Sequence, residues 1–304
     1  MGIRLHSDEA SLMDYNITGS SVTMARVGLI QVDGTLPNLA LMKLSSFFKK
    51  RGDDVVFIDL SSFGIEKWFA SKVFIGGSGY DLSKALPREI EEMVPDYERF
   101  GLDYSMGFTS RGCIRDCDFC IVREKEGTLK DADMEWIKHT KAVIMDNNFL
   151  ASPKWIDKLQ YFIDNDIKVN FNQGLDIRLI NTGNAQLLFR TKSYDRKFRT
   201  RAYYFAFDDP KLEDIVRKKV EIMISCGFRP RWIMFYILCG FNTSHAQDLH
   251  RFEVIRDIGC IPYIMKHNDR KDDTWLNHFD RWVNRRYYQY VKFEEYKNGV
   301  LKKM

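Results

Sequence analysis

The stretch Gly112-Cys-Ile-Arg-Asp-Cys-Asp-Phe-Cys-Ile-Val122 places Cys113, Cys117 and Cys120 in a C-x3-C-x2-C arrangement. Thiolates this close in sequence can converge on one soft metal centre, because iron–sulfur clusters and zinc both prefer thiolate ligands. A closed structural zinc site takes four ligands, and no fourth Cys or His lies nearby: the closest histidine is His139. A four-iron cluster held by three cysteines instead leaves one iron open to a small molecule.

The residues around the cysteine stretch predict strands that alternate with helices. Six apolar runs are strand candidates: Tyr104–Thr109, Ala142–Asp146, Ile167–Phe171, Ala202–Phe207, Trp232–Leu238 and Ile261–Met265. Starts and stops of the intervening helices are predicted at Ser152-Pro153, Asp209-Pro210, Ser244 with Gln247, Gly227 and Gly259. Six strand–helix units predict a parallel α/β fold, which right-handed crossovers would curl into a partial barrel.

The cysteine stretch, with Phe119 just before the third cysteine, resembles the signature of radical S-adenosylmethionine (SAM) enzymes. The resemblance covers roughly residues 101–270 and implies a partial (β/α)6 barrel of the TIM type. It further implies that Cys113, Cys117 and Cys120 hold a [4Fe–4S] cluster whose open iron binds the amino and carboxylate groups of SAM. The implied activity is reductive cleavage of SAM to a 5′-deoxyadenosyl radical, which abstracts hydrogen from a substrate. A reductant of the flavodoxin or ferredoxin type is the implied partner.

Polar residues that follow the strands are candidates for binding SAM, because reactive groups of a parallel α/β barrel lie at the carboxyl ends of strands. Asp146, Asn147 and Asn148 stand where the family binds the SAM amino group, often with Gly-Gly-Glu. The inference rests on position alone. An Asx turn or a helix cap is the alternative for Asn147 and Asn148.

Later strands supply four more candidates. Arg178 could pair bidentately with the SAM carboxylate, although a surface pair with Asp176 is the alternative. Asn172 and Gln173 could hydrogen-bond the ribose, and Gly240 could let the backbone approach adenine closely.

Three further cysteines show no cluster spacing. Cys239 follows a strand at the reactive end, where it could donate a hydrogen atom or hold an intermediate; a buried thiol is the alternative. Cys226 and Cys260 are interpreted as packing residues. A second cluster, and with it sulfur insertion, is therefore disfavoured.

Residues 22–100, after a patternless lead-in at 1–21, predict a small parallel α/β domain and a linker. Strands are expected at 26–32, 54–59 and 72–76, with a helix at 39–50, and the glycine-rich loop 76–80 is either a tight turn or a phosphate cradle. This domain resembles a shortened, Rossmann-like cobalamin-binding domain of the kind that precedes many radical-SAM catalytic domains.

One departure from the cobalamin-binding family concerns its cobalt ligand. That family ligates cobalt through the His of an Asp-x-His-x-x-Gly loop, whereas the corresponding loop here reads Asp33-Gly-Thr-Leu-Pro-Asn38. No histidine occurs between His6 and His139. The departure argues against cobalamin as a cofactor and, mildly, against methyl transfer through it.

Composition leaves the partner open. The chain of 304 residues is 45% hydrophobic and 29% charged, enough for one large domain or two modest ones, and its net charge of +4 neither demands nor excludes nucleic acid. Neither the apolar core of a signal peptide nor a run of about 18 apolar residues occurs. No membrane association and a cytoplasmic location are therefore expected.

Two basic stretches bear on the substrate. Residues 190–201 carry six cationic side chains against Asp195 and are expected to form a solvated loop opposite the cluster, although a long polyanion could reach that far. The tail, 271–304, interleaves aromatic and basic residues, which could either stack bases or close the barrel with an aromatic face; the latter is favoured. Its members are Trp275, Phe279, Arg281, Trp282, Arg285, Arg286, Tyr287, Tyr288 and Tyr290.

The substrate class stays open at this point: a nucleic-acid base, a peptide side chain or a small metabolite would all be compatible. The alternative function is a non-enzymatic nucleic-acid-binding module whose thiolates hold zinc.

Overall fold

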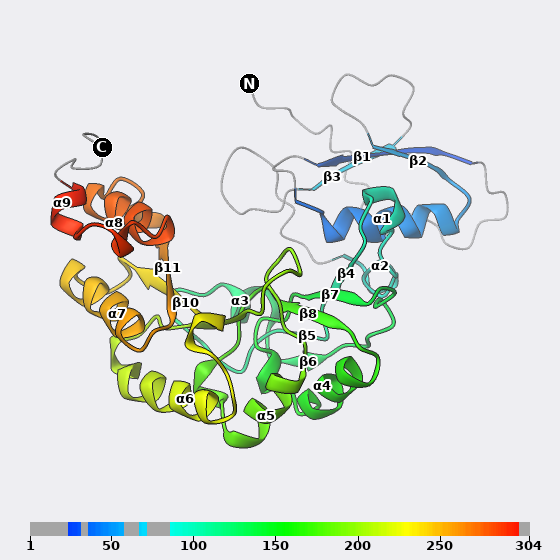
Figure 1. Ribbon diagram of the computed structural model, residues 1–304. Helices are drawn as coiled ribbons and strands as arrows, with labels where there is room; N and C mark the ends of the chain where they lie inside the picture. The colour runs from blue at the N-terminus through cyan, green and yellow to red at the C-terminus, as the bar shows by residue number, and fades with distance from the viewer. Residues whose placement is uncertain (1–23, 32–35, 58–66, 72–85, 298–304) are drawn as a thin grey trace. The chain divides into compact units, whose positions relative to one another are not determined.

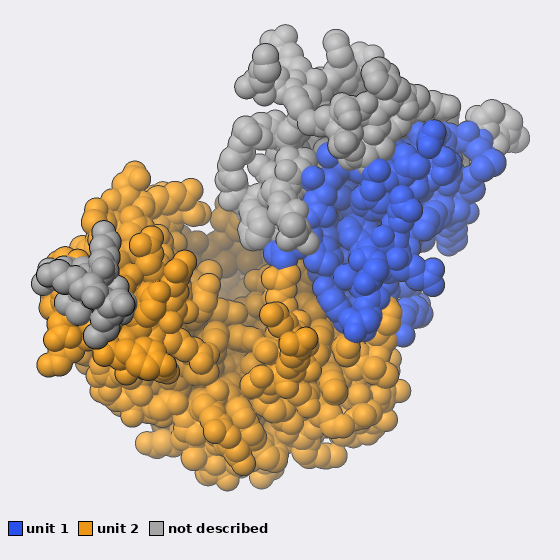
Figure 2. Space-filling view, turned by 45° about the horizontal axis from the view of Figure 1, so that its top comes forward, with its two compact units in different colours: residues 1–106, 135–138 blue, residues 107–134, 139–304 orange. Residues whose placement is uncertain are grey.

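The computed structural model describes residues 24–31, 36–57, 67–71 and 86–297 (Figure 1). These residues form a mixed α/β fold with parallel sheets, as the sequence predicted. The chain divides into two compact units, drawn in different colours in Figure 2. Unit 1 comprises residues 1–106 and 135–138, and unit 2 comprises residues 107–134 and 139–304.

Unit 1 contains a parallel sheet in the order β2-β1-β3, formed by β1 (Arg26–Gln31), β2 (Asp54–Phe57) and β3 (Lys67–Ser71). Helix α1 (Leu39–Lys50) buries Leu41 and Phe48 against Leu29 of β1, and a short helix α2 (Arg88–Glu91) follows. The Asn38 side chain caps α1 by accepting a hydrogen bond from the Leu41 N–H at 3.2 Å.

The sequence predicted α1 correctly and placed β1 and β2 within a few residues of their observed ends. The predicted strand at 72–76, the glycine-rich loop 76–80 and the lead-in 1–21 lie outside the described residues, as does the start of the Asp33–Asn38 loop. The third strand of this sheet is β3, a segment that the sequence analysis did not predict as a strand and that pairs with β1 from Lys67 onward.

Unit 2 is organised around strands that the sequence predicted to within two residues. They are β4 (Ser105–Gly107), of which only Gly107 belongs to unit 2, β7 (Lys141–Ile144), β8 (Lys168–Phe171), β9 (Tyr203–Ala206), β10 (Ile233–Cys239) and β11 (Ile261–Lys266). Two three-stranded sheets result, in the orders β4-β7-β8 and β9-β10-β11.

The two sheets are connected just beyond the end of β8. The Leu175 N–H donates to the Tyr204 carbonyl at 2.7 Å, and Leu175 forms a parallel bridge with Phe205 of β9. At the other side of β7, the Met145 N–H donates to the carbonyl of Gly107, the last residue of β4, at 2.9 Å. The strands therefore follow one another in the order β4, β7, β8, β9, β10, β11.

Helices α4 (Trp155–Asp164), α5 (Thr182–Arg190), α6 (Glu213–Ser225) and α7 (His245–Asp257) lie on the outer side of these strands (Figure 1). Their boundaries follow local chemistry. Ser244 and Gln247 form the predicted capping box of α7, and Gly227 and Gly259, at φ of +98° and +76°, directly follow the caps of α6 and α7.

The predicted start of α4 at Ser152 is wrong. The helix begins at Trp155 after an N-cap at Lys154. The Ser152 hydroxyl accepts from the Lys154 N–H at 3.1 Å, as a cap would, but it also lies in a buried cluster, where it bonds to Asp131 at 2.5 Å and to the Lys158 ammonium at 2.9 Å. Tertiary partners thus share this hydroxyl with the local bond.

The C-terminal segment packs on the last strand. Helix α8 (Thr274–Asn284) buries Phe279 and Trp282, and the Trp282 ring lies 5.0 Å from that of Phe252 in α7. The Asn284 side chain bonds both backbone groups of Ile264 in β11, at 2.8 and 2.9 Å. A short helix α9 (Phe293–Lys297) follows. The rings of Phe252, Phe279 and Trp282 therefore form a packed aromatic face.

Among the described residues, no helix combines the length and the apolar character that a membrane span requires.

Candidate functional site

The cysteine loop is built between two short antiparallel strands, β5 (Ser110–Arg111) and β6 (Lys130–Asp131), and contains helix α3 (Val122–Glu126). Gly112 enters the loop at a φ of +78°, and a Cβ at this position would lie 2.4 Å from the Thr128 carbonyl oxygen. Only glycine fits this close backbone approach. The loop is thus pinned at its first residue.

Glu126 holds the two ends of the loop together. Its carboxylate accepts hydrogen bonds from the Gly112 N–H and from Arg111, each at 3.1 Å, and from the Asn147 amide at 2.8 Å. Burial raises the pKa of Glu126, but the hydrogen bond and charge of Arg111 outweigh it, so the pKa lies below its usual range. A charged Glu126 therefore ties the loop to the segment after β7.

All three cysteines of the loop are free thiols. The Cys113 Sγ accepts from the Arg115 N–H at 3.3 Å and from the Asn148 amide at 3.6 Å. Cys117 and Cys120 lie on one turn, closed by a 2.8 Å bond from the Cys120 N–H to the Cys117 carbonyl. Hydrogen bonds to a cysteine sulfur, such as the two on Cys113, tune iron–sulfur centres.

The surroundings of Cys117 disfavour its charged thiolate form. Burial, the thiols of Cys120 and Cys113, and the carboxylate of Asp208 all raise the pKa of Cys117, and Arg178 opposes them. The thiols are therefore near enough to repel one another once ionised. A bound cation would relieve this repulsion.

Asp176 and Arg178, after β8, form a charged group beside the thiols. The Asp176 carboxylate accepts from the Arg178 Nε at 2.7 Å and a second guanidinium nitrogen at 3.0 Å, and from the Arg115 Nε at 3.0 Å. Burial raises the pKa of Asp176, but Arg178 and Arg115 bring it below its usual range. The bidentate partner of Arg178 is therefore Asp176, the alternative that the sequence left open, while Arg178 also lies close to Cys117.

The Asn148 side chain contacts this group through its Nδ2 and carries a buried acceptor without a partner among the described residues. Its side chain is buried, its Nδ2 lies between the Cys113 Sγ and the Asp176 carboxylate, the latter at 3.4 Å, and its Oδ1 accepts no hydrogen bond from any described residue. Nor does the side chain cap the 3-10 turn that it precedes. A buried orphan acceptor of this kind calls for a donor.

The Asp146 carboxylate is occupied by hydrogen bonds within the chain. Its buried carboxylate accepts three bonds of 2.6 Å, from the Thr109 N–H, the Thr109 hydroxyl and the Ser110 hydroxyl. Burial raises the pKa of Asp146, and these bonds oppose the rise. The carboxylate anchors the chain where it enters the cysteine loop.

Aromatic rings connect the cysteine loop to the last two strands. Phe119 makes an edge contact with Phe241, which follows β10, at 5.5 Å between centroids. Phe241 in turn lies 5.0 Å from the His267 ring, just after β11. These ring contacts link the cysteine loop to the segments that follow β10 and β11.

The remaining candidates lie at the carboxyl ends of β8 and β10. Asn172 and Gln173 are exposed in the turn after β8. Gly240 has a φ of +81°, but a Cβ there would lie 2.9 Å from side-chain carbons of Arg270 and Leu276, so packed side chains already fill this space. The Cys239 thiol is fully buried and its pKa is raised, chiefly by that burial.

Among the described residues, no group of three or more His, Cys, Asp or Glu side chains is arranged to hold a single metal ion. Two residues that bind in the site, Arg115 and Glu126, were not predicted. Arg115 lies inside the cysteine stretch, and that position was a signal that could have been used. The sequence contained no such signal for Glu126, because its partners at 111 and 147 are distant from it along the chain.

No protein-family model matches the chain, and no curated protein matches it either.

Proposed function

We propose that this protein is a radical-SAM enzyme in which Cys113, Cys117 and Cys120 hold a [4Fe–4S] cluster. The observation that carries the proposal is the meeting of one loop's three thiols with an orphan acceptor on Asn148 and a guanidinium on Arg178. These groups come from three successive parts of the chain, at the carboxyl ends of their strands. That edge is where parallel α/β proteins bind small molecules.

The strand order supports the finer fold that the resemblance implies. Six strands in the order β4, β7, β8, β9, β10, β11, with helices on their outer side, fit an open (β/α)6 barrel. The parallel sheet and α1 of unit 1 fit a shortened Rossmann-like domain. Cobalamin is no part of the proposal, because no histidine of the cobalt-ligating pattern exists.

The donor set fits a cluster. All three thiols are free, the Cys113 sulfur receives two N–H donors, and burial with the neighbouring thiols disfavours the ionised form of Cys117. A cluster distributes its thiolates over different irons, so they lie farther apart than the ligands of one ion. A cluster therefore does not call for the single-ion arrangement that the described residues lack.

When bound, the reduced cluster and SAM supply a primary carbon radical that abstracts hydrogen from an unreactive C–H bond. The chain's own residues bind and orient. The Asn148 Oδ1 is suited to accept from the SAM ammonium, and Arg178, held by Asp176, is suited to face its carboxylate. The contact between Phe119 and Phe241 places an apolar pair beside the loop.

Metal analysis with a cleavage assay tests the proposal. After anaerobic purification, the protein should contain about four irons per chain, the cluster content that the resemblance implies, and should form 5′-deoxyadenosine from SAM and a reductant. Cys117→Ala should lose both properties, whereas Cys226→Ala, a thiol outside the loop, should keep them. About one zinc per chain, or cleavage retained by Cys117→Ala, would refute the proposal.

A second test separates the two roles of Arg178. Arg178→Gln should raise the KM for SAM at least about tenfold if the guanidinium meets the carboxylate. Arg217→Gln, which removes a comparable bidentate pair with Glu213 on α6, is the matched control and should leave the KM unchanged. An unchanged KM in both variants, with lower stability in Arg178→Gln alone, would reduce Arg178 to a partner of Asp176.

A further inference from the structure

A rigid hairpin presents cations at the amino-terminal edge of the strands in unit 2. Tyr194 and Arg201 form an antiparallel bridge, and the Asp195 carboxylate closes the turn between them by accepting from the Arg199 N–H at 2.9 Å. Phe198 is buried within the turn. The side chains of Arg196, Lys197 and Arg199 are exposed.

The hairpin lies where β8 and β9 begin. Val169, the second residue of β8, forms a parallel bridge with Ser193, and the hairpin leads directly into β9. Beside it, the 3-10 turn Pro230–Trp232 leads into β10. The Trp232 ring has the Arg201 guanidinium carbon 5.6 Å and the Arg229 guanidinium carbon 5.3 Å from its centroid. Trp232 thus holds two more cations next to the hairpin.

Three segments, 166–168, 190–201 and 229–231, together carry nine cationic side chains and only two acidic ones, Asp166 and Asp195. We term these nine cationic side chains the basic edge. The basic edge comprises Lys168, Arg190, Lys192, Arg196, Lys197, Arg199, Arg201, Arg229 and Arg231. Lys192 pairs with Asp166. Arg190, Arg196, Lys197, Arg199, Arg229 and Arg231 form no ion pair with another described residue. Such a surface is complementary to closely spaced negative charges.

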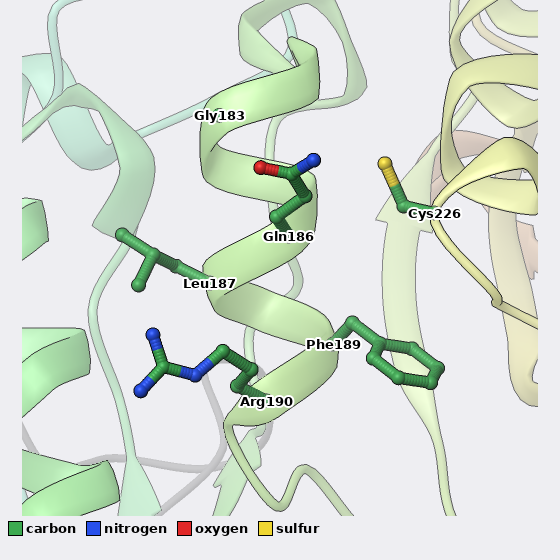
Figure 3. Close-up of a pocket in the computed structure, with 6 residues that line it drawn as sticks. All are labelled: Gly183, Gln186, Leu187, Phe189, Arg190 and Cys226. Atoms are coloured by element: carbon green, nitrogen blue, oxygen red, sulfur yellow. The ribbon is translucent and has the colours of Figure 1, made fainter.

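A pocket of about 360 Å³ adjoins the basic edge on α5. Gln186, Phe189 and Cys226 are among its lining residues; Figure 3 shows the Gln186 amide and the Cys226 sulfur facing each other, with the Phe189 ring on the same side of the helix, farther along it. The Phe189 side chain is 37% exposed, and Arg201 of the hairpin donates to the Phe189 carbonyl at 2.9 Å. An aromatic ring and a primary amide next to unpaired cations are the groups that bind a base beside its phosphate.

We propose that the basic edge and this pocket bind a single-stranded nucleic acid. The cations contact successive phosphates, and one base stacks on Phe189 within reach of the Gln186 amide. A duplex is disfavoured, because its stacked bases could not enter the pocket. The surface lies at the amino ends of the strands, whereas the thiols lie at the carboxyl ends, so this binding is separate from the proposed cofactor site and independent of it.

Binding of fluorescent single-stranded RNA and DNA oligonucleotides, followed by anisotropy over a range of salt concentrations, tests the surface. The variant R196S/K197S/R199S should bind at least about tenfold more weakly, and the slope of log K against log salt should fall by about 2, because three phosphate contacts are lost. The variant K50S/K211S/K218S removes three exposed cations elsewhere and should change neither quantity appreciably. Equal weakening in both variants would overturn the proposal.

The pocket has its own variants. Phe189→Ala should weaken binding about tenfold without changing the salt slope, since stacking is uncharged, whereas Ile156→Ala, an exposed apolar residue on α4, should have no effect. Because Phe189 also contacts Phe228, Gln186→Ala provides a second, exposed variant. No effect of either pocket variant, or equal affinity for anionic vesicles or an acidic peptide, would overturn the proposal. The ratio of RNA to DNA affinity then identifies the natural strand.

Discussion

The two edges of the strands in unit 2 differ in how their charged side chains are buried and paired. At the carboxyl edge, charged groups are buried and paired: Arg251 and Asp248 have no exposed side-chain surface and lie 2.6 Å apart, and Asp176 is shared by Arg178 and Arg115. At the amino edge, seven of the nine cations of the basic edge are exposed, and most of the nine have no acidic partner among the described residues.

This difference in burial and pairing suits the two edges to two different kinds of ligand. Paired groups in a low-dielectric interior keep fixed directions, so they suit a small ligand whose atoms must be held in place. Exposed cations attract over a distance that salt limits, and they suit an extended polyanion. The substitutions that follow should therefore destabilise the protein at the carboxyl edge and leave its stability intact at the amino edge.

The largest effect is expected from Asp248→Ala. It leaves the fully buried Arg251 guanidinium without its counter-ion, which should lower the free energy of unfolding by about 3–5 kcal/mol. Asp257→Ala removes an exposed pair with Arg256 and should cost about 0–1 kcal/mol. Urea unfolding measures both; equal losses would show that burial of the pair is unimportant.

A somewhat smaller loss is expected from Gly112→Ala in the cysteine loop. The positive φ and the overlap with the Thr128 carbonyl should together cost about 2–4 kcal/mol. Gly101→Ala has a φ of +60° but nothing within 4 Å of the added Cβ, so about 1–2 kcal/mol is expected. The two variants thus isolate the close approach, and indistinguishable values would mean that the loop moves freely.

A pH-dependent loss is expected from Asp176→Asn. Because Arg178 and Arg115 lower the pKa of Asp176 in the folded protein, its charge stabilises fully above the ordinary aspartate pKa of about 3.9 and less as the pH falls through the folded value. The variant should therefore be about 1.5–3 kcal/mol less stable at pH 7, and the difference should shrink below about pH 4.

Urea unfolding across that range provides the measurement for Asp176→Asn. Asp157→Asn, an exposed carboxylate on α4, is the control and should stay within about 0.5 kcal/mol of the parent protein. A difference that grew on acidification would contradict the assigned direction of the Asp176 pKa.

Local patterns in the sequence were sufficient for most of the fold. The capping box at Ser244 and the apolar spacing of Leu39–Lys50 depend on neighbours within a few residues, and the structure has both. The helix start predicted at Ser152 was wrong, because α4 begins at Trp155. The Ser152 hydroxyl bonds to the Lys154 N–H but also to Asp131 and Lys158, which no local pattern encodes.

The site was less predictable for the same physical reason. The three thiols share one short stretch, so their sequence alone suggested a common role. The partners of Arg115 and Glu126 lie 61 and 21 positions away, at Asp176 and Asn147, and no local period encodes such contacts. Arg178 was singled out correctly as a residue of the edge, but its bidentate acceptor in the structure is Asp176.

The smallest effect on stability is expected at the basic edge. R196S/K197S/R199S should change the free energy of unfolding by less than about 0.5 kcal/mol, because these side chains are exposed and form no ion pair with a described residue. At low salt the free energy of unfolding of the variant should rise slightly, because like charges that repel one another in the folded hairpin are removed. Arg201→Ser is the matched contrast within the same hairpin, because Arg201 donates to the Phe189 and Thr191 carbonyls and should lose stability. A loss above about 1.5 kcal/mol in the triple variant would mean that the exposed cations hold the hairpin together, and the contrast between the two edges would then fail.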